Sequence, residues 1–178
     1  MGLFKETNPS DTSDKSGKSE LMENFDHLRR LTIFKDIPFE IVKLFAYTAK
    51  RSLYPENRFI FRQGELSSHA SLIIGGKVRL LVTKEGKEVE VQCLTSGDFF
   101  GFMSLLAGFE WPLSAQSIGD TELLLMNRED FRRILMRFPE QCIILVERLV
   151  QMRMKRLNEH MNVMVDKLGG EPLSHLLD

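Results

Sequence analysis

Hydrophobic residues near the start of the chain follow a helical spacing. Steps of three and four residues place four apolar side chains on one helix face: Leu21, Phe25, Leu28 and Leu31. A second, short helix is predicted over 38–50, where Pro38 suits the first turn. Residues 1–20 hold almost no apolar side chain after Phe4, so they cannot bury enough surface to fold. We therefore expect a disordered tail before the first helix.

The middle of the chain has the pattern of a β protein. From Ser52 to Met126, short runs of β-branched and aromatic residues alternate with turn signals such as Gly75-Gly76 and Ser96-Gly97-Asp98. The runs are 58–62, 71–74, 77–83, 88–94, 113–118 and 122–127. Evenly spaced short strands of this kind predict an antiparallel sandwich or barrel. The segment 101–108 interrupts the pattern and is predicted to form one helical turn between strands.

Strict alternation is clearest in the segment 87–94. One face is predicted to carry Val89, Val91 and Cys93, and the other Glu88, Glu90 and Gln92.

The last third of the chain returns to helical spacing. Asn127 is a good N-cap, and the acidic pair Glu129-Asp130 suits the first turn of the helix that follows. That helix should end near Phe138-Pro139. No further Pro or Gly occurs up to residue 168, so we expect one long helix of about 45 Å.

The long helix carries an apolar stripe with a mean spacing close to 3.5 residues, the period of a two-stranded coil. We call this stripe the seam: Ile143, Val146, Val150, Met154, Leu157, Met161, Met164 and Leu168. Part of the helix, over 142–146, is expected to pack on its own domain, and the rest has no core of its own to cover. The spacing therefore predicts a homodimer through this helix. Packing of the whole stripe on the same domain is the alternative.

Composition narrows the function classes. The formal net charge is −1 and the pI is about 6.4, so nucleic acid and anionic membranes are not expected partners. No secretory signal or membrane-spanning run is seen. Cys93 and Cys142 are too few for a disulfide framework or a metal site, and we expect reduced cysteines in a cytoplasmic protein. Ser114 has no identifiable His and Asp partners and no catalytic motif is found, so an enzyme is not expected.

Four stretches of the segment 31–136 follow one another in a specific order: LTIFKDIPFEIVKLF (31–45), YPENRFIFRQGE (54–65), GGKVRLLVTKEGKEVEVQCLTSGDFFG (75–101) and TELLLMNREDFRRIL (121–135). In order and spacing they resemble the cyclic nucleotide-binding domain shared by the catabolite activator protein family, protein kinase A regulatory subunits and gated channels. The resemblance implies a mainly β fold with α: an antiparallel, jelly-roll-like β-roll, N-terminal helices, a short cassette helix and a long C-terminal helix. We therefore expect a roll domain over 21–137, a dimerisation helix over 138–168 and a tail over 169–178.

The resemblance also implies where a ligand would bind. In the family, a phosphate cassette holds the cyclic phosphate through backbone N–H groups, an Arg and a Ser/Thr, while a Glu binds the ribose. The cassette residues and expected pocket of this chain are Phe100, Gly101, Phe102, Met103, Ser104, Leu113, Ser114 and Ala115. Gly101, Ser114 and Ala115 match the family pattern. Phe102 stands in place of the Glu and Leu113 in place of the Arg, so both ionic contacts are missing.

We therefore expect a regulatory module with little affinity for cAMP or cGMP, and no certain cofactor. A pocket filled by its own side chains is the favoured interpretation, and an apolar ligand is the sharper hypothesis. Haem would need an axial ligand, and none of the four histidines falls in a telling motif: His27, His69, His160 and His175. Two alternatives stay open, a true receptor with atypical contacts and a dimeric adaptor that recruits a protein partner. Residues 169–178 are too short for a helix-turn-helix unit, so direct DNA binding is not expected.

Overall fold

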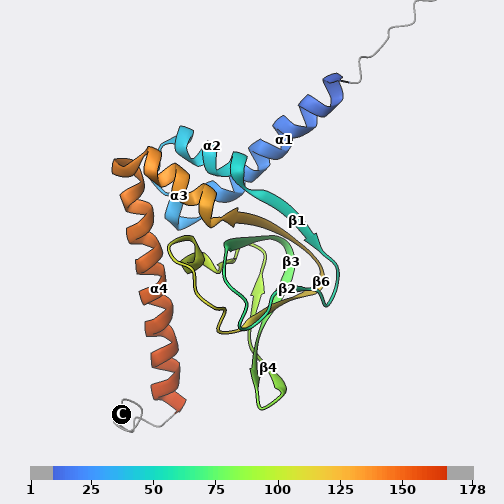
Figure 1. Cartoon of the computed structure of the whole chain (residues 1–178), viewed down its shortest axis with the longest axis vertical. Helices are drawn as coiled ribbons and strands as arrows, with labels where there is room; N and C mark the ends of the chain where they lie inside the picture. Colours follow the sequence, from blue (N-terminus) through green and yellow to red (C-terminus); the bar gives the residue numbers. More distant parts are fainter. Residues whose placement is uncertain (1–9, 168–178) are drawn as a thin grey trace, which may run out of the picture.

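The computed structural model describes the backbone of residues 10–167 and, within it, the side chains of residues 18–166. Helices α1 (Ser10–Arg29), η1 (Thr32–Phe34), α2 (Phe39–Thr48) and α3 (Arg128–Arg137) gather at one end of a β-roll. Helix α4 (Pro139–Lys167) runs down one side of the roll (Figure 1). Residue 168 and the predicted tail over 169–178 lie outside the described residues.

The roll is one antiparallel sheet of six strands. The strands are β1 (Lys50–Tyr54), β2 (Phe59–Phe61), β3 (His69–Lys84), β4 (Lys87–Thr95), β5 (Phe99–Phe100) and β6 (Ser114–Asn127), with the short helix η2 (Phe102–Leu105) between the last two. Along the main path the order is β1-β6-β3-β4, while β2 pairs with β6 and β5 with β3. The predicted antiparallel β-roll with flanking helices is therefore confirmed.

In two places, two successive strands predicted from the sequence form a single long strand in the structure. The runs 71–74 and 77–83 join in β3, and the runs 113–118 and 122–127 join in β6. The turn predicted at Gly75-Gly76 is absent. At these glycines the register between β3 and β6 shifts, and the two strands stay paired on either side. Gly76 has a φ of +83°, and a Cβ on it would lie 2.6 Å from the carbonyl oxygen of Asp120. Glycine at this position therefore permits a bulge in a continuous ladder rather than a reversal of the chain.

Other boundaries also differ from the prediction. Helix α1 begins at Ser10, inside the segment predicted as a disordered tail, because a helix satisfies its backbone hydrogen bonds internally and can extend from an apolar, docked part into a polar one. Strand β1 begins at Lys50, which the sequence placed in the preceding helix.

The alternation predicted for 87–94 does not continue through β4. Leu80 pairs with Gln92 and Leu81 with Glu90, so the ladder skips Val91 at a bulge. Both Val89 and Val91 are 53% exposed, since this hairpin extends beyond the roll (Figure 1).

Buried side chains form two cores, one on each side of the β3–β6 ladder. The helical core joins α1, η1, α2, α3 and α4 to one face of the sheet and includes Phe34, Phe45 and Phe131. The roll core fills the interior of the roll and includes Phe61 and Trp111. The predicted N-cap of α3 is confirmed, since the backbone N–H of Glu129 donates to Oδ1 of Asn127 at 2.7 Å.

Helix α4 packs on the domain through a face that the seam does not share. We call this face the inner stripe: Cys142, Leu145, Leu149, Met152 and Arg156. Arg148 adds polar contacts, donating to the carbonyl oxygens of Ile33, at 3.1 Å, and of Lys35. Within the described residues, no helix combines the length and the apolar character that crossing a bilayer requires.

Replacing Leu149 with Ala tests this orientation of α4. Leu149 is fully buried, so the variant should lose about 2–5 kcal/mol of unfolding free energy. Gln151→Ala, an exposed position on the same helix, should change it by less than about 0.5 kcal/mol. Urea unfolding followed by circular dichroism measures both, and equal losses would contradict the inner stripe.

Candidate functional site

The cassette begins at a left-handed turn between β5 and η2. Gly101 has a φ of +69°, and a Cβ on it would lie 2.9 Å from Cη2 of Trp111. Its backbone carbonyl accepts from the N–H of Ser104 at 3.0 Å, which closes the first turn of η2. Glycine is thus required both by the backbone conformation and by the close approach of the indole ring.

The structure divides the predicted pocket residues between the two cores. Phe100, Leu113 and Ala115 belong to the roll core, whereas Phe102 and Met103 pack in the helical core. Phe102 and Leu113, which are predicted to stand in place of the family's charged groups, are therefore not brought together.

The two cassette serines are both buried but differ in their hydrogen bonding. Oγ of Ser114 accepts from the backbone N–H of Gln63 at 2.9 Å and so ties β6 to the end of β2. Oγ of Ser104 has no hydrogen-bond partner among the described residues.

Aromatic rings of the chain itself occupy the interior of the roll. The Trp111 and Phe61 rings stack with centroids 3.9 Å apart and planes only 10° from parallel. Phe109 meets Trp111 edge-on at 5.3 Å, and Phe100 lies 6.2 Å from Phe61. The roll interior is consequently packed at the level of the cassette.

Some polar atoms beside this interior have no hydrogen-bond partner among the described residues. They include Nε2 of His69 and Oγ of Ser71, which share one side of β3 with the roll-core residue Ile73. Burial lowers the pKa of His69, and Nδ1 of its ring lies 3.1 Å from Oγ of Ser68. The roll interior thus holds a neutral imidazole and a hydroxyl among its apolar groups.

No cation is predicted at the cassette from the sequence, but in the structure Arg156 lies there. Nη2 of Arg156, on α4, donates to the carbonyl oxygen of Phe99 at 2.9 Å, and the guanidinium carbon lies 5.1 Å from the centroid of the Phe102 ring. Burial lowers the pKa of Arg156, while Asp98 acts in the opposite direction. The signal that could have found it is the inner stripe, whose members are spaced 3, 4, 3 and 4 residues apart along α4.

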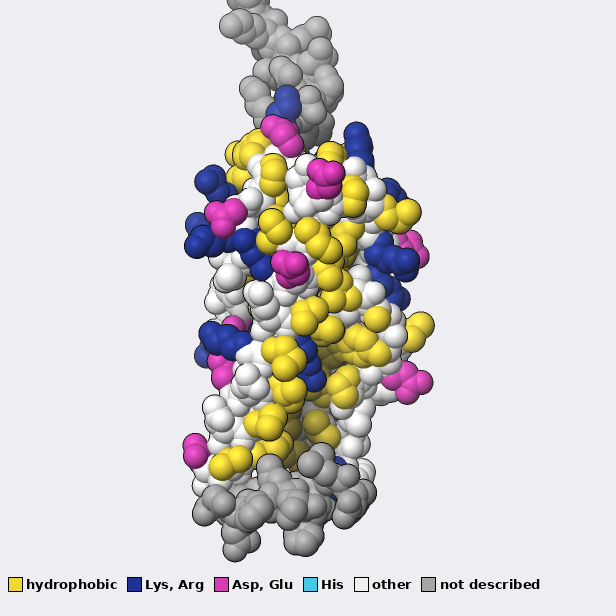
Figure 2. Space-filling view, turned by 90° about the vertical axis from the view of Figure 1, so that its left-hand side faces the viewer, with side chains coloured by type: hydrophobic (Ala, Val, Ile, Leu, Met, Phe, Trp, Pro, Cys, Tyr) yellow, Lys and Arg dark blue, Asp and Glu magenta, His cyan; other side chains and the backbone are white. Residues whose placement is uncertain are grey.

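The seam lies on the outward side of α4. Its described members are exposed by 39–56%, apart from the half-buried Val146, and they are Ile143, Val150, Met154, Leu157, Met161 and Met164. Figure 2 shows this face of the molecule with hydrophobic side chains running along the helix. Leu168, the last predicted seam residue, lies outside the described residues. Among the described residues, no group of three or more His, Cys, Asp or Glu could hold a metal ion.

Comparison with known proteins gives the same fold and domain. Residues 51–138 match the sequence model of a family described as the cyclic nucleotide-binding domain. The chain is 37% identical over 128 residues to a cyclic AMP receptor protein of Thermus thermophilus, over 71% of this chain and 57% of that one. It is 28% identical over 149 residues to a cGMP-dependent 3′,5′-cGMP phosphodiesterase of Dictyostelium discoideum, over 84% of this chain and 16% of that one.

A solved structure agrees. The crystal structure of the Thermus thermophilus catabolite activator protein superposes with a TM-score of 0.64 and 36% identity, covering 77% of this chain and 62% of that chain. The chain therefore spans less than two thirds of these relatives, and only the matched domain is compared.

Gly101→Ala tests the turn that opens the cassette. Gly119 has a similar φ of +66° with open space around its Cα, so Gly119→Ala is a matched control for backbone strain of about 1–3 kcal/mol. Gly101→Ala should lose more unfolding free energy than the control and should displace the ring of Trp111, the chain's single tryptophan. A red shift in tryptophan emission for Gly101→Ala alone is expected, and identical spectra would contradict the contact.

Proposed function

We propose that the chain is a non-enzymatic regulatory module with little affinity for cAMP or cGMP, because residues 51–138 match the sequence model of the cyclic nucleotide-binding domain family. A regulatory role is supported by its likeness to a protein named a cyclic AMP receptor, at 37% identity. The proposal of low affinity is supported by the cassette of this chain.

One observation carries that proposal. The two positions at which the family pattern has charged groups hold Phe102 and Leu113, each packed in an apolar core. A hydrogen bond to a charged group contributes about 1.5–3 kcal/mol, and a buried anion without such partners is costly. The stacked Phe61 and Trp111 rings add to the case, since they use space inside the roll.

A second candidate, a receptor with atypical contacts, is favoured by the position of Arg156. This side chain supplies a cation beside Phe99 and Phe102, at the start of the cassette. If it paired with the cyclic phosphate, it would do so from α4 rather than from the roll.

Calorimetric titration with cAMP and cGMP separates the two candidates. For the wild type we expect no heat of binding at micromolar ligand. The double variant Phe102→Glu/Leu113→Arg introduces the two charged groups of the family pattern, and if their absence is what prevents binding, it should raise the affinity at least about 100-fold. The introduced carboxylate lies close to Arg156, which can balance its charge.

Micromolar binding by the wild type that is lost in Arg156→Gln would establish the atypical receptor instead. Circular dichroism and the emission of Trp111 report whether each variant keeps the native fold.

We also propose that the chain forms a homodimer through the seam. The support is the exposure of the seam's apolar side chains while the inner stripe of the same helix is buried. A monomer would leave this row of side chains in water along the described length of α4 (Figure 2). The inner stripe, and not the seam, is the face of α4 that packs on the domain, so the whole seam cannot also pack there.

Leu157→Asp and Asn158→Asp test the dimer. Both positions are exposed neighbours on α4, and both variants gain one negative charge, but only Leu157 is in the seam. Two buried leucines per dimer contribute about 3–6 kcal/mol, so Leu157→Asp should raise the dimer dissociation constant at least about 100-fold. Sedimentation equilibrium measures this, and a wild type that stays monomeric at high concentration would refute the seam.

A further inference from the structure

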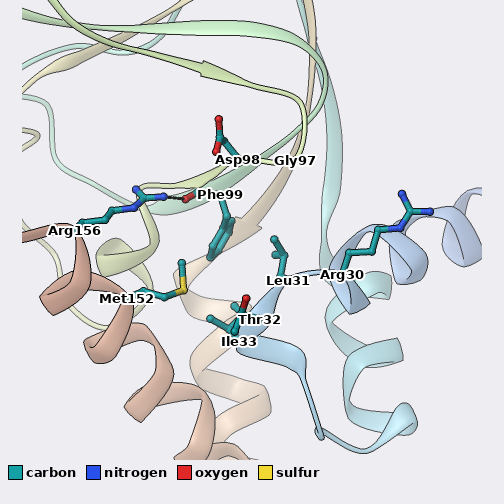
Figure 3. Close-up of a pocket in the computed structure, with 9 residues that line it drawn as sticks. All are labelled: Arg30, Leu31, Thr32, Ile33, Gly97, Asp98, Phe99, Met152 and Arg156. Carbon is teal, nitrogen blue, oxygen red and sulfur yellow. Dashed lines mark hydrogen bonds between the residues drawn. The ribbon is translucent and has the colours of Figure 1, made fainter. Parts of the chain in front are cut away.

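A cavity of about 230 Å³ lies outside the roll, where three separate segments meet. Its walls come from residues 30–33 between α1 and η1, from the turn 97–99 between β4 and β5, and from Met152 and Arg156 on α4 (Figure 3). No part of the predicted pocket lines it. The cavity therefore lies beside the predicted pocket rather than within it, and Phe99 and Arg156 adjoin both.

Arg156 is the charged residue of this cavity that contacts the cassette. A guanidinium has five N–H donors, and the hydrogen bond recorded for Arg156 is the one to the carbonyl oxygen of Phe99. In the part of the chain that the structure describes, Arg156 has no carboxylate within 4.0 Å. Burial lowers the pKa of Arg156, while the more distant carboxylates of Asp98 and Glu159 act in the opposite direction. A bound anion would supply the missing partner.

Two other charged residues, Asp98 and Arg30, line the cavity, and neither pairs with Arg156. Oδ2 of Asp98 accepts from the backbone N–H of Thr95 at 2.7 Å, so this carboxylate is held within its own turn. Figure 3 shows the guanidinium of Arg30 directed away from Arg156.

Polar and apolar atoms contribute about equally to the exposed walls of the cavity, and the apolar part lies beside Arg156. Figure 3 shows Leu31, Phe99 and Met152 around the space beside Arg156, with Thr32 and Ile33 below them. One cationic end and an apolar body match a ligand with one acidic group on a hydrocarbon frame. The volume is below the roughly 300–1,000 Å³ of sites for drug-sized ligands, which favours a single ring or a short chain.

We propose that this cavity binds a small organic carboxylate, with its carboxylate on Arg156 and its apolar body against Leu31, Phe99 and Met152. A planar guanidinium pairs with a carboxylate through two parallel hydrogen bonds, which explains the preference for this anion. The proposal requires no cyclic nucleotide in the roll, so it does not depend on the low affinity proposed above, although it shares Arg156 with the atypical receptor.

Benzoate and its neutral analogue benzamide test the proposal by ¹H–¹⁵N NMR titration of the full chain. Benzoate should shift the backbone amides of residues 30–33, 97–99 and 152–156 in a saturable way. Benzamide has nearly the same shape but no charge, and its affinity should be at least about tenfold lower. Equal affinities, or no saturable shifts with benzoate, would overturn the proposal.

Two variants locate the site. Arg156→Gln should weaken benzoate binding at least about tenfold, whereas Arg153→Gln, an exposed arginine on the same helix, should leave it unchanged. Leu31→Trp should abolish binding by filling the cavity while keeping Arg156. Undiminished binding in either Arg156→Gln or Leu31→Trp would refute the assignment. If a variant fails to fold, the benzoate–benzamide comparison on the wild type still decides the matter.

Discussion

The antiparallel pairing of β3 with β6 is the constraint on which the rest of the structure depends. The pairing runs from His69 opposite Asn127 to Leu81 opposite Ser114, with register shifts at the glycines of β3. Because side chains alternate across a sheet, this ladder separates an interior roll core from a helical core. The cassette leaves β5 where the two cores meet, which is why Phe100 faces the roll while Phe102 faces the helices.

Helix α4 carries two apolar rows of side chains, the buried inner stripe and the exposed seam. The inner stripe fixes the helix to the domain through Leu145, Leu149 and Met152, and it ends at Arg156 on the cassette. The seam residues Met154 and Leu157 are exposed and lie within one helical turn of Arg156.

Predictions from the sequence succeeded where short-range patterns decide the structure and failed where distant partners do. The N-cap at Asn127 and the length of α4 follow from neighbouring residues. The reading of Gly75-Gly76 as a turn was wrong, because only the pairing with β6 shows that the glycines form a bulge. The bulge at Val91 likewise depends on the opposite strand and cannot be read from the alternation of β4 alone.

By itself, the sequence determined the resemblance to the cyclic nucleotide-binding domain, the apolar residues Phe102 and Leu113 in the predicted cassette, and the spacing of the seam. These features lie in local spacing and residue identity, which need no tertiary structure. Tertiary structure alone decided that Phe102 and Leu113 enter different cores and that Arg156 meets Phe99. That contact joins residues 57 positions apart, and no local pattern specifies which carbonyl a distant guanidinium will reach once the helix is docked.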